Sequence, residues 1–143
     1  MKTRYLAFLL IPFFSFTQKT ISVNHKKGNL RSYPESKINI GGSEGYYYDN
    51  VSEPQMDLYL AKGKAVTDKA MIICPGGGLY FLSYVKEGIE VAKKLASNGI
   101  TAIVLKYRTY PREGSVYKWH KAFCCDSKMA IDSAKTILPY SSK

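Results

Sequence analysis

The chain has 143 residues, of which 45% are hydrophobic and 22% charged, a composition that excludes disorder throughout and allows one domain with a core. The formal net charge is +10, but the lysines are scattered along the chain and form no basic stripe with interleaved aromatic residues. We therefore expect solvated surface lysines and no nucleic-acid partner.

Residues 1–17 have the organisation of a secretory signal peptide. Lys2 and Arg4 form a basic start, an apolar run from Tyr5 to Phe16 follows, and small residues at its end predict cleavage before Gln18. The run is shorter than the roughly 20 residues that span a bilayer, so no stable membrane span is expected after cleavage; retention as an anchor is the alternative. No cysteine adjoins the cleavage site, which argues against a lipoprotein anchor. The sequence thus predicts a secreted or periplasmic protein with a formal charge of +8 after cleavage.

Residues 18–48 form a polar, turn-rich segment that ends in three consecutive tyrosines, 46 to 48. We interpret the tyrosine run as strand packing, and stacking on sugars is the alternative. Beyond it, Met56, Leu58 and Leu60 alternate with polar or aromatic residues, which predicts a strand with one covered face.

Residues 69–108 predict a strand, a glycine turn, a helix and a second strand. The apolar runs from Ala70 to Cys74 and from Ile100 to Leu105 are typical of central strands covered on both faces. Between them, Val85 to Ser97 has apolar residues at helical spacing, and Asn98-Gly99 ends the helix. The predicted inner face comprises Ile89, Ala92 and Ala96, flanked by Val91 and Leu95.

The turn Pro75-Gly76-Gly77-Gly78 is the main chemical feature of the chain. Three glycines after a buried strand leave backbone N–H groups uncovered, so that an anion or a developing oxyanion can approach them. A strand-to-helix turn that merely needs unusual dihedral angles is the alternative. A dinucleotide fingerprint beginning at Gly76 would need glycine where Phe81 stands, and the chain contains no G-x-x-x-x-G-K-[ST], so both nucleotide motifs are excluded.

The stretch 109–120 is predicted to be an aromatic-rich loop. It follows the carboxyl end of a strand, as the glycine turn does, and ligands in α/β sheets bind at that edge. Tyr80, Tyr107 and Arg108 are the candidate cleft-lining residues, with structural packing as their alternative role. A helix is predicted from Cys124 to Leu138 and is stopped by Pro139; its apolar positions are Cys125, Met129, Ala130, Ala134, Ile137 and Leu138.

All three cysteines are interpreted as structural or incidental. Cys74 ends a predicted buried strand, where a thiol packs well, and Cys124 and Cys125 are neighbours, for which a disulfide would be strained. The absence of C-x-x-C removes the redox and zinc interpretations, and no metal site is expected.

Three motifs together carry a family resemblance: C-P-G-G-G-L-Y from Cys74, the pair Glu87-Gly88, and N-G-I-T-A-I-V-L-K-Y-R ending at Arg108. They resemble the α/β-hydrolase superfamily, specifically its secreted, acetylxylan-esterase-like branch of carbohydrate esterases. The likeness runs from about Met56 to Leu138. It implies the N-terminal part of an α/β-hydrolase fold: a mostly parallel sheet with an antiparallel leading strand and helices on both faces.

The resemblance also assigns roles to the glycine turn. The main-chain N–H groups of Gly77 and Gly78 would form part of an oxyanion hole, while Gly76 makes the turn. The family uses a serine nucleophile with a histidine base and an acid, and it requires neither metal nor organic cofactor.

The departures from the family are equally informative. The chain has no G-x-S-x-G, so no catalytic residue can be carried over; Asp126 fits a structural position on the second helix, and His120 precedes any nucleophile, contrary to family order. Ser83, Ser115 and Ser127 lack an activating motif.

We therefore expect residues 49–143 to be an incomplete α/β-hydrolase domain, inactive by itself, from a secreted ester hydrolase. In the intact family the substrate would be acetylated polysaccharide or another small ester. A non-catalytic glycan-binding protein and a fragment of an α/β-hydrolase peptidase are the alternatives.

Overall fold

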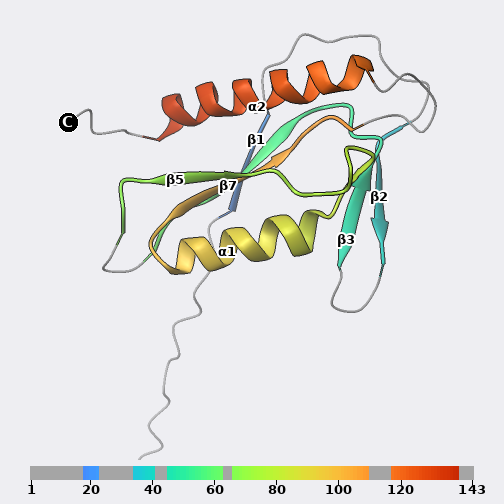
Figure 1. Ribbon diagram of the computed structural model, residues 1–143. Coiled ribbons are helices and arrows are strands. Elements are labelled where there is room, and N and C mark those ends of the chain that lie inside the picture. The colour runs from blue at the N-terminus through green and yellow to red at the C-terminus, as the bar shows by residue number, and fades with distance from the viewer. Residues whose placement is uncertain (1–17, 23–33, 41–44, 63–65, 110–116, 139–143) are drawn as a thin grey trace, which may run out of the picture.

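The computed structural model describes residues 18–22, 34–40, 45–62, 66–109 and 117–138, except for the side chains of residues 117–123. Figure 1 shows a central sheet with α1 on one side and α2 on the other, and a hairpin beside it. The strands are β1 (Gln18–Ser22), β2 (Ser36–Asn39), β3 (Tyr46–Asp49), β4 (Gln55–Tyr59), β5 (Ala70–Ile73), β6 (Phe81–Leu82) and β7 (Thr101–Lys106). The helical segments are η2 (Tyr84–Ile89), α1 (Glu90–Ser97) and α2 (Tyr117–Ile137).

The larger sheet has the strand order β1-β4-β7-β5. Strand β4 runs antiparallel to both β1 and β7, whereas β5 runs parallel to β7, with Ile72 opposite Ile103. The parallel pair is joined by η2 and α1, because parallel neighbours need a long crossover. The predicted α/β class, with an antiparallel leading strand and helices on both faces, is confirmed. The sheet was predicted to be mostly parallel, but its described part is mixed, because two of its three strand pairs are antiparallel.

Of the two strands predicted to be central, only β7 is. Residues 102–106 of β7 are all buried, but β5 pairs with β7 alone among the described strands, and Met71 is 47% exposed. Cys74 lies beyond the strand and is exposed, contrary to the predicted buried packing. A short apolar run identifies a strand, but it does not reveal how many neighbours pair with it.

Strand β4 differs from the prediction of one covered face, because both of its faces are covered. Met56 and Leu58 on one face and Asp57 and Tyr59 on the other are all buried, while Leu60 lies outside the strand and is 45% exposed. The face that carries Asp57 and Tyr59, which the sequence pattern assigned to solvent, is covered by residues that include Tyr84 of η2.

The buried carboxylate of Asp57 is stabilised by three donors. Thr20 Oγ1 donates at 2.6 Å, Gln18 Nε2 at 2.9 Å and the Tyr84 hydroxyl at 3.0 Å. Hydrogen bonds of this kind offset the cost of removing a carboxylate from water. They also attach β1 and η2 to β4.

The smaller sheet, in the order β2-β3-β6, explains the tyrosine run. The rings of Tyr46 and Tyr48 contact that of Tyr84, with centroids 6.2 and 5.0 Å away, and Tyr47 contacts Phe81 at 5.5 Å. Burial raises the pKa of Tyr48 to about 12 and that of Tyr84 further. The interpretation of this run as strand packing is confirmed.

The predicted helix after the glycine turn is present but has two parts. Its first six residues form the π-helical turn η2, and α1 follows. Ala92 and Ala96 are fully buried, whereas Val91 is 42% exposed and so lies outside the predicted inner face. Gly99, at φ +82°, ends the segment where the sequence predicted.

Helix α2 begins at Tyr117, so residues 117–120 are helical and the loop prediction was wrong for them. Ala130 and Ala134 are buried against the sheet, as expected. Cys125 is exposed, contrary to its predicted place on the inner face, and Ile137 is 37% exposed.

The predicted signal peptide, residues 1–17, lies outside the described ranges. None of the helices within those ranges has the length and apolar character needed to span a bilayer.

Candidate active site

The glycine turn lies at the carboxyl end of β5 and leads directly into β6. Gly77 has φ +140°, Gly78 +63° and Leu79 +68°, so three successive residues adopt conformations that side chains disfavour. A Cβ atom at Gly77 would overlap the carbonyl oxygen of Phe81. Glycine is therefore required at position 77 by both backbone conformation and space.

The internal hydrogen bonds of the turn use its carbonyl groups and leave two of its amides free. Tyr80 N donates to Gly77 O at 3.1 Å, and Ser83 N donates to Gly76 O at 2.9 Å. The Gly76 amide donates to Glu87 Oε2 at 2.9 Å. In the described part of the chain, no acceptor faces the amides of Gly77 and Gly78. These two N–H groups are thus available to an external anion.

The Glu87-Gly88 pair holds the turn in place from η2. Glu87 binds the first amide of the turn, and Gly88 is buried where a Cβ would lie 2.8 Å from Val104 Cγ1 and 3.1 Å from Pro75 Cγ. Glycine at 88 therefore lets η2 pack closely on β7 and on the start of the turn. A π-helical turn at this position is a feature often found at functional sites.

Tyr107 supports the turn from the neighbouring strand. Its buried hydroxyl donates to the carbonyl of Pro75 at 2.7 Å. Burial, followed by the nearby Cys74 and Glu87, raises the pKa of Tyr107 to about 12, so the phenol stays protonated at neutral pH. Of the candidate cleft-lining residues, Tyr107 thus lies beneath the turn.

Arg108 pairs with Asp126 of α2. The backbone N of Arg108 donates to Asp126 Oδ2 at 2.9 Å, Nε donates at 3.0 Å, and a second guanidinium nitrogen binds Oδ1. The Asp126 side chain is fully buried and that of Arg108 is 11% exposed. Asp126 therefore has the structural role that the sequence assigned to it.

Tyr80, the third candidate for lining the cleft, is 51% exposed and lies two residues after the last glycine of the turn.

The described residues assemble no nucleophile with a base. His25 lies outside the described ranges, and the side chain of His120 is not described. Although Cys74 is exposed at the surface, partial desolvation by the surrounding atoms raises the pKa of its thiol, which disfavours a reactive thiolate. No disulfide joins the three cysteines. Within the described ranges, no cluster of three His, Cys, Asp or Glu residues could hold a metal ion.

Sequence reasoning missed the structural roles of Glu87 and Tyr107. Glu87 is eleven residues from the amide it binds, and Tyr107 is thirty-two from its carbonyl partner. The signal for the first was the Glu87-Gly88 pair, which the sequence did single out, but without a partner. For the second there was no local signal, because the contact joins two strands.

Comparison with known proteins gives structural matches only. No family model and no curated protein matches the chain. The solved structures that match include a lipase/esterase from Lactobacillus plantarum, with 24% sequence identity and a TM-score of 0.46. The match covers 73% of this chain and 39% of that structure. An α/β serine hydrolase without a lid from Xanthomonas campestris matches with 15% identity and a TM-score of 0.47, over 76% of this chain and 48% of that structure. An α/β serine hydrolase homologue from Coxiella burnetii matches with 16% identity and a TM-score of 0.47, over 82% of this chain and 50% of that structure.

The chain spans half or less of the length of these three structures. Two of them are described as an α/β serine hydrolase and a homologue of one, and the third as a lipase/esterase.

Proposed function

We propose that this chain carries the oxyanion loop of a serine-dependent carboxylic ester hydrolase. The amides of Gly77 and Gly78 would donate to the oxygen that becomes negatively charged when an ester carbonyl is attacked. Gly76 would make the turn, and Glu87 and Tyr107 would hold it. Tyr80 would border the substrate.

One observation carries this proposal. Of the three glycine amides, the first is bound by Glu87, while the second and third have no acceptor within the described ranges. They lie at the carboxyl end of β5, the edge at which α/β sheets bind their ligands. Fixed donors of this kind stabilise a transition state because they need no reorganisation during the reaction.

The finer assignment follows from the sequence resemblance. It favours the secreted, acetylxylan-esterase-like branch, with acetyl esters on polysaccharide as substrate and a serine, a histidine and an acid supplied by polypeptide outside this chain. The apolar start of residues 1–17 supports export to the periplasm or the medium. The family mechanism needs no metal and no organic cofactor.

The first test is the activity of the chain as given. We expect hydrolysis of p-nitrophenyl acetate at the background rate, because the described residues assemble no activated nucleophile. Steady turnover that is abolished by Ser83→Ala would contradict the assignment of the loop as one part of a larger catalytic site.

The second test examines the coding sequence downstream of Lys143 in all three frames. A G-x-S-x-G segment followed by an acid and a histidine would support the proposal, and the longer product should release acetate from acetylated xylan. In that product, Gly77→Ala keeps the backbone N–H, but its Cβ would overlap the Phe81 carbonyl oxygen and force the loop and its amides to shift. A misplaced oxyanion donor should lower kcat by about 100-fold, as a lost donor does, with little change in KM. An unchanged kcat in a folded variant would refute the oxyanion role.

A non-catalytic glycan-binding protein is the second candidate. The tyrosines that suggested it now pack on Tyr84 and Phe81, which leaves less ring surface for sugars. Retention on a xylan column by a soluble monomer, together with a stop codon and an unrelated downstream gene, would favour this alternative.

A further inference from the structure

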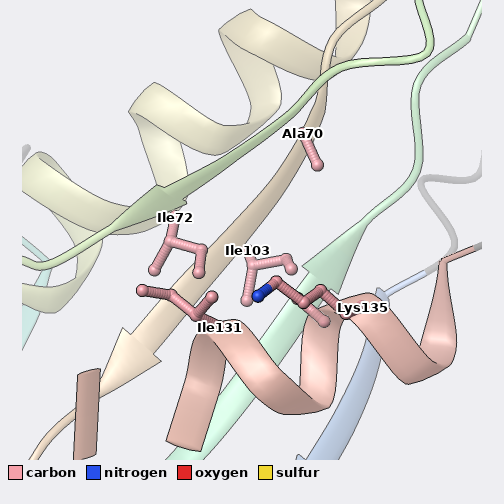
Figure 2. Close-up of a pocket in the computed structure, with 6 residues that line it drawn as sticks. Ala70, Ile72, Ile103, Ile131 and Lys135 are labelled. Carbon is pink, nitrogen blue, oxygen red and sulfur yellow. The ribbon is translucent and has the colours of Figure 1, made fainter. Parts of the chain in front are cut away.

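A cavity of about 650 Å³ lies between the sheet and α2, away from the glycine turn. Its walls are Ala70 and Ile72 of β5, Ile103 of β7, and Ile131, Ala134 and Lys135 of α2. Figure 2 shows the isoleucines of the two strands facing Ile131, with the Lys135 side chain lying alongside them. A second cavity of about 300 Å³ adjoins it at Ala70.

The first cavity combines an aliphatic wall with one cation. Six of the described residues line it: five are alanine or isoleucine, and the sixth is Lys135. Within the described ranges, no carboxylate lies at ion-pair distance from Lys135. Ile131, at the rim, is 45% exposed. The lining therefore offers apolar contact along its length and charge complementarity for one anionic group.

This chemistry selects among the possible occupants. Among the described lining residues, a polar or aromatic heterocyclic ligand would find no hydrogen-bonding side chain other than Lys135. A second copy of the chain would carry the same positive net charge, formally +8 after the predicted cleavage, and repulsion between like-charged copies opposes self-association. A linear aliphatic chain that ends in a carboxylate satisfies both features, and the volume lies within the usual range of ligand pockets, about 300–1,000 Å³.

We propose that this cavity binds a single-chain carboxylate amphiphile, with the alkyl chain between Ile72, Ile103 and Ile131 and the carboxylate on Lys135. The flexible stem of a lysine allows its ammonium to follow a head group at the rim while its methylenes cover the alkyl chain. The site is separate from the glycine turn and does not depend on the proposed hydrolase function.

The binding test uses the full chain with cis-parinaric acid as fluorescent probe and palmitate as competitor, below their micelle concentrations. We expect saturable probe binding and displacement by palmitate. Shortening the competitor from sixteen to fourteen to twelve carbons should weaken binding up to about fourfold per methylene, from the transfer free energy of a buried CH₂. Hexadecanol, which has the same chain but no charge, should bind more weakly than palmitate.

Three variants test the role of the charge. Lys135→Ala removes apolar contact from both ligands but charge only from palmitate, so it should weaken palmitate binding about two- to fivefold more than hexadecanol binding, as expected for a solvent-accessible charge pair. Lys135→Arg should restore palmitate binding. The control is Lys93→Ala, an exposed lysine of α1 on the opposite side of the sheet, which should have no effect. Ile131→Glu places a carboxylate at an exposed position on the rim and should abolish palmitate binding without unfolding the protein.

Several results would overturn the proposal. These are the absence of saturable displacement, equal losses for Lys93→Ala and Lys135→Ala, or full palmitate binding by a folded Ile131→Glu variant. Sedimentation that reveals a stable dimer, whose association Ile131→Glu disrupts and palmitate does not, would assign the cavity to a second copy instead.

Discussion

The Arg108–Asp126 pair supports a quantitative prediction about stability. Replacing Asp126 with alanine leaves the largely buried guanidinium of Arg108 without its carboxylate and the backbone amide of Arg108 without its acceptor. Breaking a buried ion pair from one side costs about 3–5 kcal/mol. Since a domain of this size is stable by about 5–15 kcal/mol, the variant should lose a large part of its free energy of unfolding.

Asp126→Asn separates the charge from the hydrogen bonds. The amide oxygen can still accept from the Arg108 backbone and from one guanidinium nitrogen, so we expect a loss of about 2 kcal/mol, between those of Asp126→Ala and the parent. Asp132→Ala is the matched control on the same helix, since Asp132 is exposed and an exposed change is usually within about 0.5 kcal/mol.

The assay is urea unfolding followed by far-UV circular dichroism, with midpoints compared at constant slope. A double-mutant cycle with Arg108→Met and Asp126→Leu isolates the coupling, and the double variant should be more stable than Asp126→Ala alone. A loss below about 1 kcal/mol for Asp126→Ala, or equal losses for Asp126 and Asp132, would refute the reasoning.

Two further predictions concern the glycine turn and alkaline pH. Gly78→Ala should lower the free energy of unfolding by about 1–2 kcal/mol, the cost of a left-handed residue, because the nearest atom to its new Cβ is 3.8 Å away and causes no clash. Gly77→Ala should lower it by more, because its Cβ would overlap the Phe81 carbonyl oxygen. Equal losses in urea unfolding would contradict the steric argument. Tyr48 and Tyr107, with pKa values raised to about 12, contribute stability that is complete below the unfolded value of about 10 and is lost as pH rises from 10 to 12. Absorbance at 295 nm should therefore report their ionisation together with unfolding, and their ionisation near pH 10 in a folded protein would contradict the assigned burial.

The sequence predicted the order of the elements well where the pattern was local. The strands at Ala70 and Ile100, the helix between them and its end at Gly99 are present, because periodicity and turn chemistry are properties of neighbouring residues. The run Ile100 to Leu105 was also correctly placed at the centre of the sheet.

The errors concern long-range partners. The sequence could not indicate that Asp57 is buried under Tyr84, nor that β5 pairs on one side only in the described sheet. The early start of α2 was missed because Pro111 and Gly114 suggested that the loop continued. At the candidate site, the glycines were identified from the motif, but which amide is already bound depends on a carboxylate from another segment, Glu87.

The parallel pairing of β5 with β7 has a consequence for the order of folding. It is the only parallel pair among the described strands, and its crossover contains the glycine turn, η2 and α1. The antiparallel contacts of β4 do not wait for that crossover to close, whereas the pairing of β5 does, and closing a long loop slows folding. We therefore expect the two unoccupied amides to acquire their orientation late, when β5 docks, so that the geometry needed for chemistry matures after much of the core has formed.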